Sequence, residues 1–237
     1  MKLSAPIFRL KRQAKLLARE DGIPLHEAQD RIARSEGFQR WSQLAAQHAE
    51  TSVAKELLDG LQAGELVLLA GKREHGKTTL AFHLIAEAAA VGRSSAYFSL
   101  DESDEDVVAR LEACGVDPAS VEAHVSFDTS DAIEAAYVAE RCAGAAAGTL
   151  VVVDYLQILD QQRHKPDLDE QVETLRAFAV DTGSIVVVLA QIDRSFDATG
   201  ASMPALEHIR MPNPIDLGRF DKACFIHEGE ITVATAA

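Results

Sequence analysis

The sequence predicts an α/β fold in which helices flank a mostly parallel central sheet, preceded by a small helical module. Two observations support this prediction. From residue 51 onward, short apolar runs alternate with helical stretches, and continuous apolar strands are typical of a parallel sheet covered on both faces. Residues 1–50 show helical periodicity alone. We therefore divide the chain into a small basic helical module, 1–50, and an α/β domain, 51–237.

The helical module is expected to hold three short helices. An apolar stripe with three- and four-residue spacing runs through 7–17. Gly22 and Pro24 separate this helix from a second one, and a third follows Trp41. So small a bundle buries too little apolar surface to be very stable alone. Two roles stay open for it: docking or oligomerisation, and contact with nucleic acid.

The α/β domain shows alternating strand and helix patterns. Strands are expected at 65–70, 94–100, 124–127, 149–153, 184–190, 223–226 and 230–233. Helices are expected at 78–91, 104–113, 131–147 and 168–180. The stretch 195–216 has no clear periodicity, and loops of that length are usually functional or mobile.

The charge of the chain is unevenly divided. The whole sequence has a net charge of −14, whereas residues 1–50 carry nine Lys or Arg against six Asp or Glu, a net of +3. Residues 51–237 therefore carry −17. This acidity argues against a protein whose whole surface binds nucleic acid, and it marks the basic module as separate.

Several features favour a cytoplasmic protein that does not contact a membrane. No apolar run approaches the length needed to span a bilayer, and the first residues lack the apolar stretch of a signal peptide. Cys114, Cys142 and Cys224 are widely spaced and form no C-x-x-C pair. We expect them to be buried, unbridged thiols in a reducing compartment rather than disulfide partners or metal ligands.

The clearest motif lies between the strand at 65–70 and the helix at 78–91. It reads Gly71-Lys72-Arg73-Glu74-His75-Gly76-Lys77-Thr78 and fits the P-loop pattern G-x-x-x-x-G-K-[ST]. Backbone N–H groups of such a loop cradle phosphate oxygens, and the next helix presents its positive end to them. We expect the motif, together with Thr79, to bind a nucleotide. Its flanking strand and helix argue against the alternative, an ordinary glycine-containing turn.

Individual roles follow from the chemistry of phosphate binding. Lys77 would neutralise the β- and γ-phosphates, and the Thr78 hydroxyl would bind Mg²⁺. A second acidic group is needed at the same edge of the sheet, and the apolar strand 149–153 delivers Asp154 there. An Asp that closes a strand is often only a turn cap, but beside a P-loop it is expected to hold the metal.

Four motifs in order resemble the RecA-type ATPase domain of replicative helicases of the DnaB kind. They are Gly60 to Ala70, Tyr97-Phe98-Ser99-Leu100-Asp101, Asp154-Tyr155-Leu156-Gln157 and Leu189-Ala190-Gln191-Ile192-Asp193-Arg194. The resemblance covers roughly residues 55–230. Circadian-clock and RadA-type relatives share this fold but match the last two motifs less well.

The resemblance implies ATP as the nucleotide and further catalytic roles. Gln191 would report γ-phosphate occupancy to the loop that follows it. An acid at the end of the second strand would orient the attacking water; it is a Glu in the family, whereas Asp101 stands here with Glu102 beside it. Aspartate is one methylene shorter, so hydrolysis is expected to be slow. Glu102 could substitute for it if the strand end bends, although its side chain should begin on the opposite face of the strand. An acidic helix start is the alternative interpretation of 101–106.

The sequence also departs from the helicase pattern. The family carries basic residues near its C-terminus that reach a neighbouring subunit's nucleotide, but 223–237 contains no Lys or Arg. Such a finger supplies about 10³–10⁵ in rate, and Arg219 and Lys222 are the candidate substitutes. The candidate DNA-contacting loops are modestly basic; their cations are Arg163, Lys165, Arg194 and Arg210.

Three functions remain open. One is a DnaB-like ATPase that assembles into homo-oligomers and acts on single-stranded DNA, binding it weakly and with a steep salt dependence. The second is an ATP-gated regulatory or scaffold protein whose nucleotide state controls a protein partner docked on the N-terminal helices. The third, nucleotide binding without turnover, is disfavoured because Lys77, Thr78 and Asp154 are all present.

Overall fold

The computed structural model describes residues 3–5, 7–159, 166–211, 213 and 215–236. The chain forms two compact units, Met1–Ala54 and Lys55–Ala237. No helix in these described ranges combines the length and the apolar character that crossing a bilayer requires.

The N-terminal unit is built from helices α1 (Ile7–Glu20), α2 (Leu25–Ser35) and most of α3 (Trp41–Gly60). Its core joins one side chain from each helix; these are Leu10, Ala33 and Leu44. The third helix was expected to be short. It continues to Gly60 because neither Gly nor Pro interrupts the sequence after Trp41.

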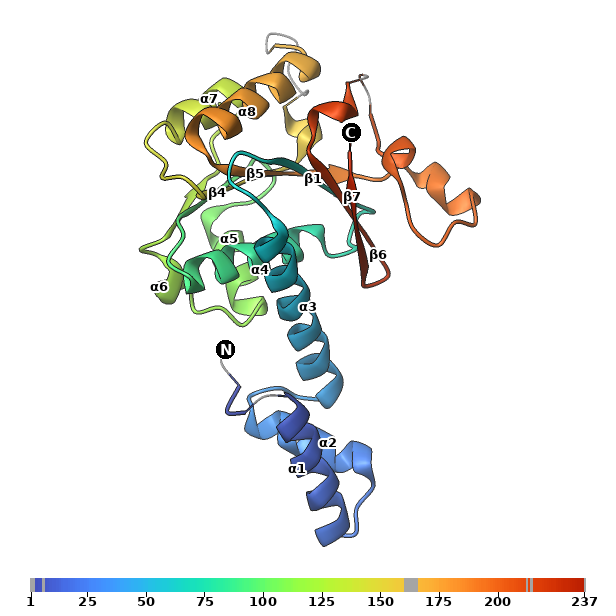
Figure 1. Ribbon diagram of the computed structural model, residues 1–237. Helices are drawn as coiled ribbons and strands as arrows, with labels where there is room; N and C mark the ends of the chain where they lie inside the picture. Colours follow the sequence, from blue (N-terminus) through green and yellow to red (C-terminus); the bar gives the residue numbers. More distant parts are fainter. Residues whose placement is uncertain (1–2, 6, 160–165, 212, 214, 237) are drawn as a thin grey trace. The chain divides into compact units, whose positions relative to one another are not determined.

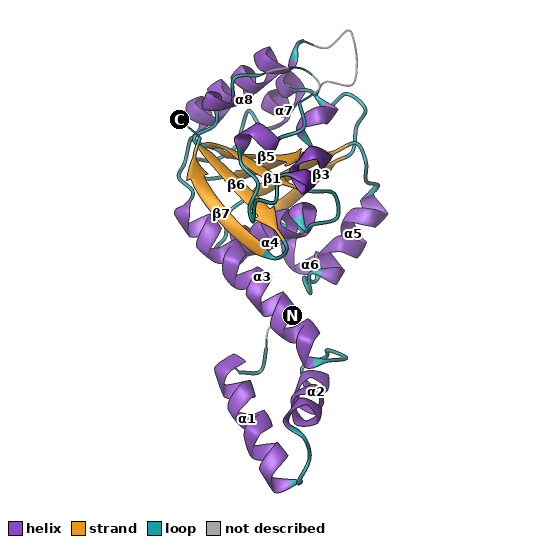
Figure 2. Ribbon diagram, turned by 90° about the vertical axis from the view of Figure 1, so that its right-hand side faces the viewer, coloured by secondary structure: helices purple, strands orange, loops and turns teal. Residues whose placement is uncertain are grey.

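The second unit contains a seven-stranded sheet in the order β3-β2-β4-β5-β1-β6-β7. The strands are β1 (Leu66–Gly71), β2 (Ser95–Ser99), β3 (Val125–Asp128), β4 (Leu150–Asp154), β5 (Ile185–Gln191), β6 (Lys222–His227) and β7 (Glu230–Thr235). All neighbours pair in parallel except β6 and β7, which form an antiparallel hairpin (Figure 2). The predicted α/β fold with a mostly parallel sheet is confirmed.

Helices cover both faces of this sheet. They are α4 (Lys77–Ala90), α5 (Asp104–Ala113), α6 (Pro118–Val121), α7 (Ala135–Arg141) and α8 (Leu168–Thr182). Figure 1 shows α7 and α8 over one face and α4, α5 and α6 over the other. The central strands β1, β4 and β5 are buried almost throughout, as their continuous apolar sequences predict.

One helix is shorter than expected. The alanine-rich stretch 131–147 predicts a single long helix, but α7 covers only Ala135–Arg141. Its first residue donates its backbone N–H to the side chain of Gln171 in α8, at 3.1 Å, and Gly144 follows soon after its last. Tertiary contact and a nearby glycine therefore override the helix preference of alanine.

The ends of four strands meet at one edge of the sheet. In the register of β2 and β4, Ser99 lies opposite Asp154, and in the register of β1 and β5, Gly71 lies opposite Gln191. Parallel strands place their carboxyl ends together, so residues far apart in the sequence share this edge. The three cysteines are buried, as expected, and none forms a disulfide in the structure.

Candidate nucleotide site

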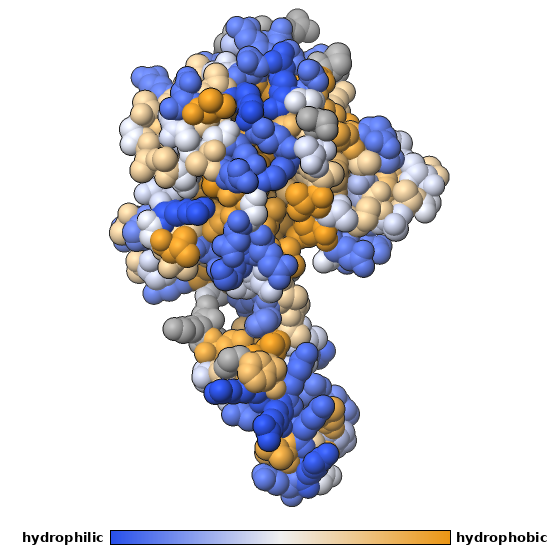
Figure 3. All heavy atoms as spheres, in the orientation of Figure 1, coloured by the Kyte–Doolittle hydropathy of each residue, from blue (hydrophilic) through white to orange (hydrophobic). Residues whose placement is uncertain are grey.

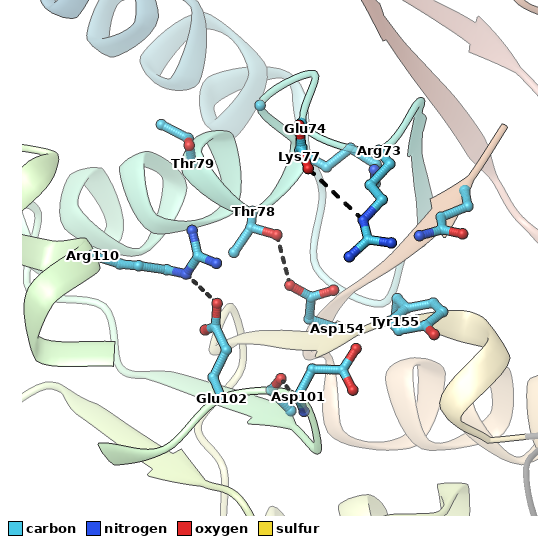
Figure 4. Close-up of a pocket in the computed structure, with 13 residues that line it drawn as sticks. Arg73, Glu74, Lys77, Thr78, Thr79, Asp101, Glu102, Arg110, Asp154 and Tyr155 are labelled. Atoms are coloured by element: carbon cyan, nitrogen blue, oxygen red, sulfur yellow. Dashed lines mark hydrogen bonds and ion pairs between the residues drawn. The ribbon is translucent and has the colours of Figure 1, made fainter. Parts of the chain in front are cut away.

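A cavity of about 540 Å³ opens at this edge of the sheet (Figure 4). Its lining residues are Arg73, Glu74, Gly76, Lys77, Thr78, Thr79, Ser99, Asp101, Glu102, Arg110, Asp154, Tyr155 and Gln191. We call it the first cavity. It brings together ten of the residues that the sequence proposes for the site, whereas Gly71, Lys72 and His75 are not among its lining residues.

Glycines shape the loop that forms one wall. Gly76 has a φ of 88°, in the left-handed region that glycine adopts without strain. A Cβ on Gly71 would lie 2.5 Å from Cγ2 of Ile226 and 2.9 Å from its carbonyl oxygen, so a side chain there would collide with β6. Helix α4 begins directly after Gly76 without a side-chain cap. Its first N–H groups are therefore available to an anion.

Lys77 lies at the base of the loop, with 8% of its surface exposed. Its ammonium donates a hydrogen bond to the carbonyl oxygen of Lys72, at 2.8 Å. Burial lowers the pKa of Lys77 below its usual value, and the nearby Asp154 carboxylate opposes this shift. The loop thus holds its own cation where an anionic ligand would meet it.

A chain of polar contacts runs through the floor of the cavity. The Thr78 hydroxyl donates to Oδ2 of Asp154 at 2.9 Å, and the phenol oxygen of Tyr97 lies 3.0 Å from that same atom. The Tyr97 oxygen is also 3.0 Å from Oε2 of Glu102, and Glu102 in turn forms an ion pair with Arg110 of α5. Tyr97 has a single O–H donor, so it can donate a hydrogen bond to only one of the two buried carboxylates at a time.

Burial sets the ionisation of these groups. It raises the pKa of Asp154 above the ordinary 3.8, although hydrogen bonds from Thr78 and Tyr97 oppose the shift. It likewise raises the pKa of Glu102 above 4.5, opposed mainly by the charge of Arg110. The pKa of Tyr97 is raised strongly by burial and by both carboxylates. Keeping these carboxylates ionised in the buried floor is therefore unfavourable in free energy. A cation bound between them would offset this penalty.

Both candidate acids after β2 line the cavity. β2 ends at Ser99, so the strand alternation that would place Glu102 on the opposite face from Asp101 does not extend to these positions. Only 8% of the Glu102 side chain is exposed, and it points toward Arg110 in Figure 4. Asp101 lies at the exposed rim.

Gln191 ends β5 between two cavities. The backbone N–H of Arg210 donates to the Gln191 carbonyl oxygen at 2.7 Å, and Ile192 forms an antiparallel bridge with Ile209. The side chain of Gln157 donates to the Arg210 carbonyl oxygen at 2.6 Å. The segment 192–211 therefore leaves the sheet edge and returns to it beside Gln191.

A second cavity, of about 600 Å³, shares Arg73 and Gln191 with the first. Its other lining residues are Lys72, His75, Ile192, Asp193, Arg194, Asp197 and Arg210. Lys72 forms an ion pair with Asp197 and lies 5.1 Å above the ring of Phe196. The phosphate loop is thus in direct contact with the segment 192–211.

Arg219 and Lys222, the candidates for a cation that reaches a neighbouring subunit's nucleotide, form ion pairs within the chain instead. Arg219 pairs with Asp169, at 2.7 Å, and with Glu173. Lys222 pairs with Glu65 at 2.7 Å. Of the candidate DNA-loop cations, Arg194 and Arg210 line the second cavity; Arg163 and Lys165 lie outside the described residues.

Sequence reasoning missed Arg110 and assigned no role to Tyr97. Arg110 reaches the cavity because α5 begins directly after the acids, with a capping box between Ser103 and Asp106 that sets the direction of the helix. The capping pattern was readable in the sequence, but the side of α5 that meets the sheet was not.

The comparison with protein families decides the class of this site. The family described as "ATPase: KaiC" matches residues 36–219, more than half of the chain. The chain belongs to the KaiC ATPase family. As a KaiC-family protein it has a RecA-like P-loop ATPase domain, which implies nucleotide binding at the loop described above. No curated protein matches the chain.

Several solved structures have a similar fold. An ATPase domain is 14% identical, with a TM-score of 0.60 and 71% of each chain covered. A DnaB-like replicative helicase is 13% identical, with a TM-score of 0.59; 73% of this chain is covered but only 54% of the helicase. A KaiC-like protein from the archaeon Pyrococcus horikoshii is 17% identical, with a TM-score of 0.54 and 70% and 74% covered.

These comparisons confirm the RecA-like ATPase class that the motifs predict. The likeness to the DnaB-like helicase, at 13% identity, is one of fold. The family that matches is that of the KaiC ATPases, whereas the sequence motifs favoured the DnaB-like helicases.

Proposed function

We propose that this protein binds ATP with Mg²⁺ in the first cavity and hydrolyses it slowly. The observation that carries the proposal is the 2.9 Å contact between the Thr78 hydroxyl and the Asp154 carboxylate, beside the uncapped start of α4. An oxygen pair of this kind at a phosphate-binding loop suits Mg²⁺, which prefers hard oxygen ligands. Thr78 and Asp154 would hold Mg²⁺ there, and the bound ion would neutralise charge on the phosphates.

Binding requires Lys77 to exchange partners. Its ammonium now donates to the Lys72 carbonyl oxygen, and in the complex it would donate to phosphate oxygens instead. Because the ammonium is already buried and positioned, little side-chain freedom is lost on binding. Backbone N–H groups of the loop and of the α4 terminus would hold the remaining phosphate oxygens.

Glu102 is the proposed water-orienting acid. Its side chain is buried, and Tyr97 and Arg110 hold it from two sides, so its position depends little on solvent. The opposing charge of Arg110 keeps the pKa of Glu102 from rising further, which favours the ionised form that accepts a proton from water. Asp101 at the rim is the second candidate.

Slow turnover follows from the same contacts. Arg110 lines the cavity in cis, but its ion pair with Glu102 restrains the positive charge that would stabilise a departing phosphate. Arg219 and Lys222 are neutralised elsewhere. A turnover below that of ATPases with a free arginine finger is expected.

The nucleotide state is proposed to reach the segment 192–211 through Gln191. This residue lines both cavities, and Lys72 of the loop pairs with Asp197 of the segment. A γ-phosphate that draws Gln191 toward it would change the anchorage of Arg210. In the first version of the function, this movement acts on or near single-stranded DNA in a DnaB-like homo-oligomer.

In the alternative version, the same movement gates a protein partner, and DNA is not involved. ATP turnover by the purified chain, with and without single-stranded DNA at low and physiological salt, separates the two. Turnover that rises with DNA supports the DNA-dependent ATPase. Tight ATP binding with slow turnover that DNA does not change supports the gated regulator, and absence of ATP binding would overturn both.

A further inference from the structure

Helix α1 has an exposed outer face, at one end of which the Arg9 guanidinium lies 6.0 Å from the centroid of the Phe8 ring. Spacings of three, four, seven and eleven residues from the first position place five side chains on this face: Phe8, Lys11, Arg12, Lys15 and Arg19. All five are exposed, and Phe8 is 66% exposed. Four cations thus follow an aromatic ring along about 16 Å of one helix face.

Within the described part of the chain, no neighbouring acid neutralises these cations. Among the described residues, none of the four forms an ion pair, whereas Arg31 of α2 pairs with both Asp21 and Glu27 at 2.9 Å. The single acid in α1 is Glu20, at its last position. The outer face therefore presents uncompensated positive charge in a chain whose other residues are strongly acidic.

The apolar face of α1 is already used. Leu10 and Ala14 are almost completely buried, and Leu10 packs with Ala33 and Leu44 in the core of the unit. Outside that core, the large exposed apolar side chains of α1 are Phe8 and Leu16. Figure 3 shows correspondingly small hydrophobic areas within a mostly hydrophilic surface on this unit. A helix that inserts into a lipid surface needs a broad exposed apolar face, which α1 lacks.

We propose that the outer face of α1 binds single-stranded nucleic acid. The four cations contact backbone phosphates, and the Phe8 ring stacks on an unpaired base, the combination by which proteins hold single strands without reading sequence. The charge of −17 on residues 51–237 repels a polyanion, so the basic face concentrates the interaction on this unit. The proposal extends the DNA-dependent version of the proposed function by naming a binding surface.

Fluorescence anisotropy of a labelled oligothymidylate with the full-length chain, without nucleotide, tests this surface. Lys15→Ala/Arg19→Ala removes two cations from the face. The matched control, Arg34→Ala/Arg40→Ala, removes two exposed cations from the same unit outside α1. We expect the first variant to bind about tenfold more weakly and to lower the salt slope by about 1.4. The control should stay within about twofold of the parent.

Phe8→Leu tests stacking separately, since it keeps an apolar side chain and loses the ring. Affinity for the oligothymidylate should fall about fivefold, and affinity for duplex DNA of equal length should not change, because paired bases cannot stack on Phe8. Circular dichroism melting of each variant establishes that the fold is retained.

Several outcomes would overturn the proposal. Equal loss in the α1 variant and the control would show a general charge effect. Unchanged affinity in both variants would show that the nucleic acid binds elsewhere on the protein. Preferential binding to phosphatidylserine vesicles that is lost in the α1 variant would identify a lipid surface as the occupant. Concentration-dependent self-association that is lost in the α1 variant would identify a second copy of the chain. ATP turnover without DNA should be the same in parent and α1 variants. If the parent protein shows no ATP turnover, the ATPase proposal is rejected, but the proposal that α1 binds nucleic acid is not.

Discussion

The ammonium of Lys77 donates a hydrogen bond to the carbonyl oxygen of Lys72, 2.8 Å away within the same loop. The contact prepares the loop for an anion, because the cation that phosphate requires is buried and already oriented. Lys77 and Lys72 are hydrogen-bonded to each other within the loop, so a nucleotide must break this hydrogen bond when Lys77 binds its phosphates.

Lys77→Ala should weaken ATP binding about 10- to 100-fold, because it removes a charged hydrogen bond to the phosphates. Titration calorimetry measures the change directly. Lys55→Ala is a suitable control, since that ammonium is exposed and pairs only with Asp59 among the described residues. Equal affinities of the parent and Lys77→Ala would contradict the assignment of the phosphate site.

Glu102→Gln should lower ATP turnover about 100-fold while ATP affinity changes little, because an amide cannot accept the proton from water. Asp101→Asn is the matched change at the rim and should lower turnover only a few-fold. The reverse ranking would make Asp101 the water-orienting acid. In that case Asp101→Glu, which extends the side chain by one methylene, should raise turnover.

The pH dependence of turnover should report the buried acid. Burial raises the pKa of Glu102, so turnover should fall with decreasing pH while the pH is still above the ordinary carboxyl value of 4.5. Arg110 opposes this shift. Arg110→Gln should therefore move the acidic limb of the profile to higher pH, as well as lowering the maximum. An acidic limb that stays in place or moves to lower pH would refute the role of Arg110.

Asp154→Asn should separate stability from metal binding. The folded-state pKa of Asp154 is raised, so its ionised form destabilises the fold at neutral pH, and this cost is relieved as the pH falls through that pKa. The amide oxygen can still accept from Thr78 and Tyr97. We expect the melting temperature of the ligand-free protein to rise by about 2–4 °C at neutral pH, and Mg²⁺-dependent enhancement of ATP binding to disappear.

In the same scan, a lower melting temperature without ligand would show that the carboxylate stabilises the fold. Retained Mg²⁺ dependence would place the metal on other groups.

Gly71→Ala should destabilise the second unit by about 1–3 kcal/mol, because the added Cβ would collide with Ile226. Gly60→Ala is the control, since a Cβ at that position meets no atom within 4 Å. Thermal unfolding followed by circular dichroism measures both. Equal melting temperatures of the two variants would show that β6 moves aside without cost.

The elements that carry the phosphate site could be predicted because their signals are local. The strand 65–70, the loop after it and the helix that begins near Lys77 occupy consecutive residues, and their apolar pattern and glycines report the backbone directly. The convergence of Thr78 and Asp154, 76 positions apart, also followed from the sequence. Parallel strands place their carboxyl ends at one edge, whatever the loops between them.

The details around that edge depended on tertiary structure. The place where β2 ends decides that Asp101 and Glu102 both reach the cavity, and the packing of α5 decides that Arg110 meets Glu102. The sequence 195–216 has no periodicity, so nothing in it predicts that Arg210 lies beside Gln191. The sequence by itself determined the class of fold and the phosphate loop, because local backbone conformation depends mainly on the residues next to each other in the chain. Tertiary structure decided which acid is buried and what holds it, because those contacts join elements whose relative orientation only packing sets.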